Sequence, residues 1–502
     1  MSLHAPILWN LLTHPRRICV TDDQGNHSSL KVFGAAMHLA KLIGHATQKP
    51  AVGLMLPTSA SFPMALLGAW QAGKTAVPIN YLLEQKALHH VILDSGIDTL
   101  LTVGKLLEHI GGEAAIPPGI RIIKLDELKF GPVPPLRFFA KPKDDDLAVI
   151  LYTSGTSGLP KGVMLTHKNL ESNARAAVLH AKLHSANSFL GILPNFHAFG
   201  ITILCLVPLL LGARAVYTAR FVPRRLVDLM EKERPDVFIA VPSMYAALLG
   251  VKNASPEQAK SLRFVISGAE PLPDAITTEF KRIYGKDILE GYGLTETSPA
   301  THWSTPWATK RHSVGKALPG VRTFIVDEKK NILPPDTDGE IWLAGPNLMA
   351  GYWKRPDLTE EAVAYLELPG EETPLRCLKT GDIGRVDAEG FLFITGRKKE
   401  MLIIAGENVF PREIEEVLTH HPAVHAAAVV GKADGMRGEV AVAFVELNEG
   451  ASVEGSELRA HCARELPAFK VPREIRMMAA LPRNPTGKII RRELAELVKA
   501  EK

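Results

Sequence analysis

The sequence is poor in cysteine. Its 502 residues include only four, at positions 19, 205, 377 and 462. Their scatter excludes the paired spacing of a zinc site and the dense framework of a small disulfide-bonded protein. Such sparse use of cysteine is typical of a reducing compartment, so we expect a cytoplasmic protein.

A long apolar run is missing as well. The most apolar stretch, residues 199–213, is too short to cross a bilayer and contains Pro208, so it predicts a buried helix. The first residues lack the charged and apolar regions of a signal peptide, and the last residues lack a peroxisomal targeting signal. A weak peripheral contact with a membrane stays open.

Excess charge of either sign is also scarce. Lys and Arg number 58 against 54 Asp and Glu, which gives a net charge of +4. Because no basic patch is interleaved with aromatic residues, nucleic acid is not an expected partner. The composition, 46% hydrophobic and 22% charged, is that of a globular protein. A chain of this length is longer than a domain with a single hydrophobic core usually is, so we expect at least two domains.

Apolar runs alternate with helical periodicity over the first 300 residues. We expect strands at 51–56, 75–79, 99–103, 147–151, 214–217, 237–241 and 264–267. Helices are expected at 61–72, 83–94, 223–232, 243–250 and 274–284. This order predicts βαβ units and a largely parallel sheet. Residues 116–146, rich in proline and charge, predict an irregular connection.

The pattern changes beyond residue 310. It becomes rich in strands and turns, and the last hundred residues then form a compact α+β unit. There we expect helices at 411–418, 455–466 and 490–499 and strands at 424–430 and 440–446, with a hairpin turn at 386–391. We place the domain boundary near Gly396, so the predicted domains are residues 1–396 and 397–502.

The most informative segment follows the strand at 147–151. Hydroxyl groups and glycines alternate through Thr153, Ser154, Gly155, Thr156, Ser157 and Gly158, and Lys161 adds a positive charge. Glycines let backbone N–H groups approach an anion closely, so this loop suits a polyphosphate. The spacing of a Walker A loop is absent. By itself, a run of Ser, Gly and Thr is more often a plain surface loop.

Other short segments combine glycine with a chemically active side chain. They are residues 267–270, 291–297, 379–382 with 396–397, and 484–489. The ring of Tyr292 could stack on a purine, and Glu296 offers the hard oxygen that Mg²⁺ prefers. Taken singly, each segment is explained at least as well by a turn. A lone exposed lysine such as Lys488 is nearly always solvated surface.

These segments occur in one order along the chain, together with residues 314–320, 339–341 and 345–352. In this order they resemble the AMP-forming adenylating superfamily of acyl-CoA synthetases, luciferases and the adenylation domains of peptide synthetases. The resemblance covers about residues 30–495. It implies an α/β fold with a large N-terminal domain of layered sheets and helices, a small β-barrel-like part, and a small mobile α+β C-terminal domain.

The resemblance implies a reaction in two steps, with ATP, Mg²⁺ and coenzyme A taking part. A carboxylate attacks the α-phosphate of ATP and gives an acyl-adenylate and pyrophosphate. A thiol then attacks the adenylate and gives a thioester and AMP. Two anions must meet in the first step, so preorganised cations and hydrogen-bond donors are the main catalytic device.

The resemblance also assigns roles to matching residues. The residues expected to hold the β- and γ-phosphates are Thr153, Ser154, Gly155, Thr156, Ser157, Gly158 and Lys161. Those expected around AMP are Gly268, Ala269, Glu270, Gly291, Tyr292, Gly293, Asp382 and Arg397. Thr295 and Lys488 would act at the α-phosphate, and Glu296 would bind Mg²⁺. Lys399 matches the hinge position, and Gly406 would line the tunnel for coenzyme A. Cys377 departs from relatives, many of which have an aromatic residue there.

Residues 193–200 resemble the substrate-gate region, where His197 would lie near the carboxylate and the α-phosphate. The alternative for His197 is a structural hydrogen bond at a helix start. The apolar run up to Leu211 has no charge to bind an amino acid's ammonium group, so we expect a hydrophobic, medium- to long-chain fatty acid and transfer to coenzyme A.

Four alternatives stay open. The acyl group could be loaded onto an acyl carrier protein, which would contact basic residues such as Arg473, Arg483, Arg491 and Arg492. The substrate could be an aryl or another carboxylate. An enzyme that stops at the adenylate is a third reading, although no added insertion lies between Tyr352 and Asp382. The last is a non-catalytic acyl-nucleotide-binding protein, against which the presence of Lys488, Glu296 and Asp382 argues.

Overall fold

The computed structural model describes residues 3–131, 140–153, 159–435, 437–483 and 488–499. The chain divides into two compact units. Unit 1 comprises Met1–Ala269, Phe280–Arg322 and Ala344–Leu378, and unit 2 comprises Glu270–Glu279, Thr323–Leu343 and Lys379–Lys502. The division follows contacts between residues. The predicted domain boundary after residue 396 stays a prediction.

The first sheet of unit 1 has seven strands in the order β18-β8-β7-β4-β3-β5-β6. Its strands are β3 (Ala51–Leu54), β4 (Thr75–Pro78), β5 (Thr99–Thr102), β6 (Arg121–Lys124), β7 (Leu147–Thr153), β8 (Lys161–Thr166) and β18 (Gly351–Tyr352). Strands β3 to β7 run parallel, and β8 and β18 are antiparallel additions. The predicted βαβ units are confirmed.

The second sheet of unit 1 has nine strands in the order β15-β14-β13-β12-β11-β9-β10-β1-β2. They are β1 (Ile18–Asp22), β2 (Gly25–Ser28), β9 (Ser188–Gly191), β10 (Arg214–Tyr217), β11 (Val237–Ala240), β12 (Phe264–Ser267), β13 (Leu289–Gly293), β14 (Ala300–Trp303) and β15 (Lys316–Ala317). Its middle strands are parallel, so their carboxyl ends share one edge.

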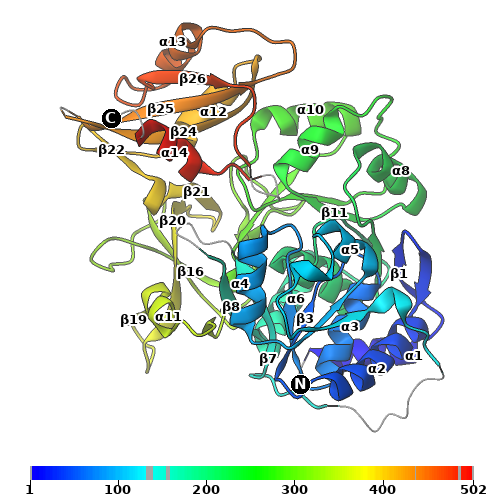
Figure 1. Cartoon of the computed structure of the whole chain (residues 1–502). Helices are drawn as coiled ribbons and strands as arrows, with labels where there is room; N and C mark the ends of the chain where they lie inside the picture. The colour runs from blue at the N-terminus through cyan, green and yellow to red at the C-terminus, as the bar shows by residue number, and fades with distance from the viewer. Residues whose placement is uncertain (1–2, 132–139, 154–158, 436, 484–487, 500–502) are drawn as a thin grey trace. The chain divides into compact units, whose positions relative to one another are not determined.

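Helices of ordinary length connect these strands (Figure 1). They are α1 (His4–Thr13), α2 (Ser29–Ala46), α3 (Ser61–Gln71), α4 (Gln85–Ser95), α5 (Gly104–His109), α6 (His167–His180), α7 (Val207–Leu211), α8 (Pro223–Glu233), α9 (Pro242–Leu249), α10 (Asp274–Tyr284) and α11 (Pro356–Ala362). Helix α6 contacts β7 and β8 of the first sheet and β14 of the second, so it lies between the two sheets. Among the described residues, no helix is both long and apolar enough to span a membrane.

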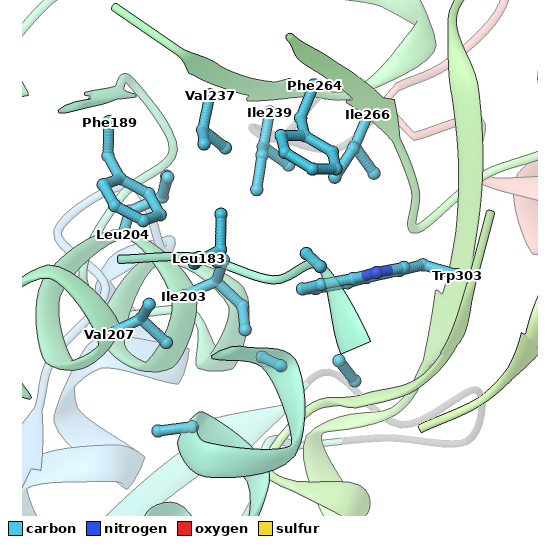
Figure 2. Packing of buried hydrophobic residues seen from close by; sticks show 14 of the residues in the cluster. Leu183, Phe189, Ile203, Leu204, Val207, Val237, Ile239, Phe264, Ile266 and Trp303 are labelled. Carbon is cyan, nitrogen blue, oxygen red and sulfur yellow. The ribbon is translucent and has the colours of Figure 1, made fainter. Parts of the chain in front are cut away.

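The core of the second sheet is almost wholly aliphatic and aromatic. Side chains from the segment after β9, including Ile203, Leu204 and Val207, face strands β11 and β12 (Figure 2). Phe189 and Trp303 close the same cluster. Each such side chain stabilises the fold by about 1.5–3 kcal/mol when it is fully buried. The segment between β9 and β10 is therefore fixed by apolar packing.

The predicted buried helix at 199–213 is confirmed with a change of helix type. Residues Gly200–Leu206 form a π-helix, η4, which continues into α7. Pro208 has no N–H to donate to the carbonyl of Leu204, as an α-helix would require. That carbonyl instead accepts a hydrogen bond from the Tyr217 hydroxyl at 2.8 Å. The Leu204 carbonyl is therefore satisfied although the residue four positions later is a proline.

One expectation about local structure is wrong. Residues 116–146 are not irregular throughout, because Arg121–Lys124 forms the edge strand β6 beside β5. The apolar pair Ile122 and Ile123 is short and flanked by charge, so its strand character depends on pairing with β5. Prolines and charges do dominate the residues on either side.

A five-stranded sheet has the order β16-β17-β20-β19, with β21 also paired to β20. Its strands are β16 (Arg322–Val326), β17 (Gly339–Ala344), β19 (Val363–Leu366), β20 (Leu375–Val386) and β21 (Leu392–Arg397). The long β20 pairs with β19 through its first residues and with β21 through its last ones. The predicted turn at 386–391 joins β20 to β21.

The end of unit 2 is an α+β structure, as predicted. Its sheet has the order β23-β22-β25-β24, with β26 paired to β25. The elements are β22 (Leu402–Ile404), β23 (Glu407–Val409), α12 (Pro411–Thr419), β24 (Val424–Asp434), β25 (Gly438–Leu447), α13 (Gly455–Glu465), β26 (Glu474–Met478) and α14 (Arg491–Lys499). Separate apolar clusters pack on its two faces. The α/β fold class is confirmed.

Candidate active site

The predicted phosphate loop joins two paired strands. Thr153 is the last residue of β7 and lies opposite Lys161, the first residue of β8. The predicted ligands Ser154, Gly155, Thr156, Ser157 and Gly158 lie outside the described residues. The strand pairing therefore fixes the two ends of the loop, including its lysine.

Lys161 lies in a polar cluster with Tyr352 and Glu296. Its ammonium donates to the Tyr352 hydroxyl at 2.6 Å, and that hydroxyl donates to the Glu296 carboxylate at 2.6 Å. The ammonium is 3.5 Å from the same carboxylate and 3.8 Å from the centre of the Tyr352 ring. Burial and the neighbouring carboxylate raise the pKa of Tyr352, so the hydroxyl keeps its proton. The cluster thus joins the predicted phosphate lysine to the predicted metal ligand.

Hydrogen bonds from the segment around Asn347 fix the backbone that carries Glu296. Glu296 lies in the short helix Thr295–Thr297, and its carbonyl accepts from the N–H of Met349 at 2.8 Å. The Asn347 amide donates to the carbonyl of Thr297, and the Ser298 hydroxyl donates to the carbonyl of Asn347, both at 2.8 Å. The segment around Asn347 and Tyr352 is therefore bonded directly to the turn that carries Thr295 and Glu296.

Asp94, at the end of α4, supports the same region. Its carboxylate accepts from the Tyr152 hydroxyl at 2.6 Å, and its carbonyl accepts from the Trp353 indole at 3.0 Å. Burial and the hydrogen bond to Asp94 raise the pKa of Tyr152, so this hydroxyl is a permanent donor. Asp94 thereby joins the residue before the phosphate loop to the residue after Tyr352.

The predicted nucleotide residues lie at the carboxyl ends of two neighbouring strands. Strand β12 ends at Ser267 beside Glu290 of the parallel strand β13. Gly268 and Ala269 follow β12, and Gly291, Tyr292 and Gly293 end β13. Ligands of open α/β sheets bind outside such strand ends.

The backbone geometry explains two of these residues. Ala269 has a positive φ of 71°, which costs energy for a residue with a side chain. A Cβ on Gly293 would lie 1.9 Å from the carbonyl oxygen of Pro299, so only glycine fits there. Strain and close approach of this kind cluster at functional sites.

His197 lies in an apolar setting, next to the ring of Phe196 at 4.8 Å between centroids. Burial lowers its pKa to about 4, so the imidazole is neutral near pH 7. Among the described residues, its Nε2 has no hydrogen-bond partner, and neither do the side-chain amide of Asn195 and the hydroxyl of Thr202. Buried polar atoms without protein partners are costly, and a polar substrate group could satisfy them.

Unit 2 places Asp382 beside Arg397. They are paired residues of β20 and β21, and Nε of Arg397 is 3.2 Å from the Asp382 carboxylate. The Thr380 hydroxyl accepts from the N–H of Asp382 at 3.0 Å and donates to the carbonyl of Ile341 at 2.7 Å. Asp382 is buried, so its carboxylate has a fixed position.

The segment that carries Lys488 is anchored on both sides. Ile489 forms a β-bridge with Arg483, and Arg491 pairs with Glu400 at 3.2 Å and with Glu415. Desolvation and the guanidinium of Arg397 lower the pKa of Lys488, while the Glu400 carboxylate raises it. Burial likewise raises the pKa of Glu270. Lys488 is exposed at the surface, with the charged groups of Arg397, Glu400 and Glu270 near it.

Two predicted positions of unit 2 lie in turns. Lys399 is exposed in the short helix Lys398–Glu400, between β21 and β22. Gly406 and Ala405 form the two-residue turn between β22 and β23, with φ of 85° and 54°. Both positive angles fit a type I′ hairpin turn. The hinge role of Lys399 and the tunnel role of Gly406 stay predictions.

Sequence reasoning missed Tyr352, Asp94 and Asn195 as functional residues. Tyr352 belongs to a segment singled out by its order in the chain, yet its role depends on the pairing of β18 with β8, almost 200 residues apart. Asp94 carries no local signal, because an acidic residue near a helix end is common. Asn195 precedes the highlighted His197 by two positions, which was the one available clue.

Comparison with known proteins identifies the family of this chain. Residues 9–353 match the family of AMP-binding enzymes, and residues 413–488 match the AMP-binding enzyme C-terminal domain. A long-chain-fatty-acid–CoA ligase of Bacillus subtilis is 37% identical over 357 residues, which cover 70% of this chain and 62% of that protein. A sulfoacetate–CoA ligase of Cupriavidus necator is 34% identical over 464 residues, 88% of this chain and 86% of that protein.

Solved structures agree as well. The o-succinylbenzoate coenzyme A synthetase of Bacillus subtilis, in complex with ATP and magnesium ion, has a TM-score of 0.83 and 29% identity, covering 98% of this chain and 99% of that one. The family match extends over most of unit 1, including the Lys161–Tyr352–Glu296 cluster. The chain therefore belongs to the AMP-binding enzyme family and is an acid–thiol ligase of the AMP-forming acyl-CoA synthetase superfamily.

Proposed function

We propose that the chain activates a hydrophobic, medium- to long-chain carboxylic acid with ATP and transfers the acyl group to coenzyme A. A carboxylate oxygen attacks the α-phosphorus, the bond to the bridging oxygen breaks, and pyrophosphate leaves. The thiolate of coenzyme A then attacks the acyl carbonyl, and AMP leaves. The relatives act on acids as different as long-chain fatty acids and sulfoacetate, so the acid has to be inferred from this chain's own residues.

The observation that carries the proposed acid is the absence of charge around η4. Residues 185–213 contain no Lys, Arg, Asp or Glu, and no carboxylate occurs from residue 172 to 227. The same segment packs into the aliphatic cluster of the second sheet (Figure 2). An amino acid would need a carboxylate for its ammonium, and a sulfonate would need a cation. An apolar acyl chain needs neither, and each buried CH₂ contributes about 0.8 kcal/mol.

The polar atoms of the same segment fit the other end of such an acid. The neutral imidazole of His197, the Asn195 amide and the Thr202 hydroxyl offer hydrogen bonds in an apolar setting. A neutral group can orient a carboxylate without neutralising the charge that attacks phosphorus. We therefore assign His197 to positioning of the carboxylate and not to proton transfer.

The nucleotide would be held by the residues predicted for it. Lys161 and the phosphate loop would take the β- and γ-phosphates, Tyr292 the adenine and Asp382 the ribose. The carboxylate of Glu296 is a hard oxygen donor near Lys161, which fits a Mg²⁺ ion beside phosphates. Bound Mg²⁺ would offset negative charge on the phosphates. Thr295 and Lys488 would stabilise the charge that develops at the α-phosphate.

Coenzyme A is favoured over a carrier protein as the thiol donor. A carrier protein presents an acidic surface, so its docking site needs available basic residues. In unit 2, Arg473 pairs with Asp434 at 2.7 Å, and Arg483 pairs with Glu446 at 3.1 Å. Arg491 pairs with Glu415 and Glu400, and Arg492 with Glu496 at 3.4 Å. All four candidate cations are thus engaged within the chain.

The test separates the two half-reactions in the Lys488→Ala variant. ATP–pyrophosphate exchange with a fatty acid should fall by at least about a hundredfold, because a cation beside the developing charge is lost. Thioester formation from supplied acyl-adenylate and coenzyme A should continue. The matched control is Lys499→Ala, an exposed lysine of α14. If exchange survives in Lys488→Ala, Lys488 does not have the assigned role.

A further inference from the structure

The positive charge of the chain is concentrated at its beginning. Residues 1–83 contain six Lys or Arg and only two carboxylates, a surplus of four. This surplus equals the net charge of the whole chain, so the remaining residues are neutral in sum. Both carboxylates are engaged: Asp22 accepts from His27 at 2.9 Å, and Asp23 pairs with Arg225 at 2.6 Å.

Large apolar side chains are exposed in the same region. Trp9 is 69% exposed and Leu12 is 42% exposed, and their spacing of three places them on one face of α1. Leu30, at the start of α2, is 51% exposed. An exposed tryptophan is unusual enough to require a reason, since such side chains are normally buried or form interfaces.

Exposed cations follow two neighbouring residues near the end of α1 and the start of α2. Helix α1 packs against α2 (Figure 1), and the N–H of Leu30 donates to the carbonyl of Pro15 at 3.0 Å. Arg16 and Lys31, next to these two residues, are exposed. We call Trp9, Leu12, Arg16, Leu30 and Lys31 the α1–α2 surface.

We propose that the α1–α2 surface docks on an anionic lipid bilayer. Tryptophan favours the boundary between lipid headgroups and acyl chains, and leucines beside it add buried apolar area. Lysine and arginine near the surface of an anionic leaflet each strengthen binding by about fivefold. This contact is peripheral, because His4, Ile7, Leu8 and Leu11 of α1 are buried and the helix packs against α2 and α7. The proposal does not depend on which acid the enzyme activates.

Vesicle sedimentation with the full-length protein tests this proposal. Wild type should bind vesicles of phosphatidylcholine mixed with phosphatidylglycerol, bind pure phosphatidylcholine weakly, and dissociate from the mixed vesicles as salt is added. The double variant Trp9→Ser/Leu12→Ser should lose about tenfold or more in affinity. Arg16→Glu/Lys31→Glu should lose at least about 25-fold, and it alters no apolar residue.

Matched controls lie elsewhere on unit 1. Leu179→Ser removes a leucine of α6 that is 67% exposed, and Lys105→Glu reverses an exposed lysine of α5. Both should bind vesicles like wild type. The proposal would be overturned if wild type does not bind anionic vesicles or if either double variant binds them like wild type. It would also be overturned if a control variant loses as much affinity as a double variant. Light scattering that shows a dimer lost in Trp9→Ser/Leu12→Ser would assign the surface to a second copy and overturn it too.

Discussion

At the scale of single residues, the Lys161–Tyr352–Glu296 cluster is the main finding. A tyrosine hydroxyl accepts from an ammonium and donates to a carboxylate, so both charged groups have a defined position. Hydrogen bonds to charged groups are worth about 1.5–3 kcal/mol each. Tyr352 is thus a positioning residue for two side chains that would bind phosphate and metal.

Removing that hydroxyl should weaken the use of ATP. Tyr352→Phe keeps the ring and loses both hydrogen bonds, so we expect kcat/KM for MgATP to fall by about tenfold or more. The dependence of the rate on Mg²⁺ concentration should shift as well. The control Tyr365→Phe alters an exposed tyrosine of β19. An unchanged ATP dependence in Tyr352→Phe would show that the cluster does not position these groups.

Several candidate site residues could be singled out from the sequence, because the motifs that carry them are short, and their roles stay predictions. Tyr292 and Asp382 each occur beside a glycine, and the structure places them on β13 and β20, whereas Glu296 lies in the short helix after β13. Tyr352 and Asp94 could not be anticipated, since their partners are distant in sequence. The functional use of a hydroxyl depends on what the fold brings near it.

At the scale of elements, strand ends position the residues proposed to bind the nucleotide. The carboxyl ends of β12 and β13 lie side by side, and β13 then turns sharply toward β14. That turn requires the close approach of Gly293 to the carbonyl of Pro299. Tyr292 lies on β13 just before the turn and Glu296 lies within the turn, so the shape of the turn sets their separation.

A methyl group at this turn should be poorly tolerated. In Gly293→Ala the new Cβ would lie 1.9 Å from a backbone oxygen, so the backbone must shift. We expect a loss of about 1–3 kcal/mol in the free energy of unfolding and a loss of adenylation. Calorimetry measures the first effect. Gly44→Ala, on α2 with open space around the new Cβ, should instead be neutral or stabilise by up to about 1 kcal/mol. Equal effects of the two changes would contradict this account.

Helices and strands could be predicted where the hydrophobic periodicity and the length of the segment indicated the same kind of element. The strands at 214–217 and 264–267 and the helix at 274–284 form with the predicted bounds. The π-helix of η4 was not predicted, because the apolar run at 199–213 indicates a buried helix and not how that helix is wound. Strand β6 was missed because its two isoleucines become a strand only beside β5.

At the scale of the whole molecule, several histidines are buried in unit 1. Burial lowers the pKa of His167 to about 4, helped by His4, and burial lowers that of His302 to about 3, helped by His180. An unfolded histidine binds its proton near pH 6.5. Below that pH the unfolded state therefore binds more protons than the folded state. The free energy of unfolding consequently decreases as the pH is lowered.

Each buried histidine should lower the free energy of unfolding by about 1.4 kcal/mol for each unit by which the pH is lowered below about 6.5. For His167 this slope should continue to about pH 4. Urea unfolding between pH 7.5 and 5 measures how the free energy of unfolding changes with pH. The His167→Gln variant should lack the part of this slope that one titrating histidine contributes. His45→Gln changes an exposed histidine of α2 and should leave the slope unchanged. An identical slope in wild type and His167→Gln would exclude His167 as a source.

The identity of the acid substrate can be read from one assay. It is AMP release with coenzyme A across straight-chain acids of increasing length, with sulfoacetate and o-succinylbenzoate as charged comparisons. We expect kcat/KM to rise by about fourfold per added CH₂ until the site is full, with little turnover of the two acids that carry a second charged group. Turnover of a charged acid with none of any straight-chain acid would contradict this expectation.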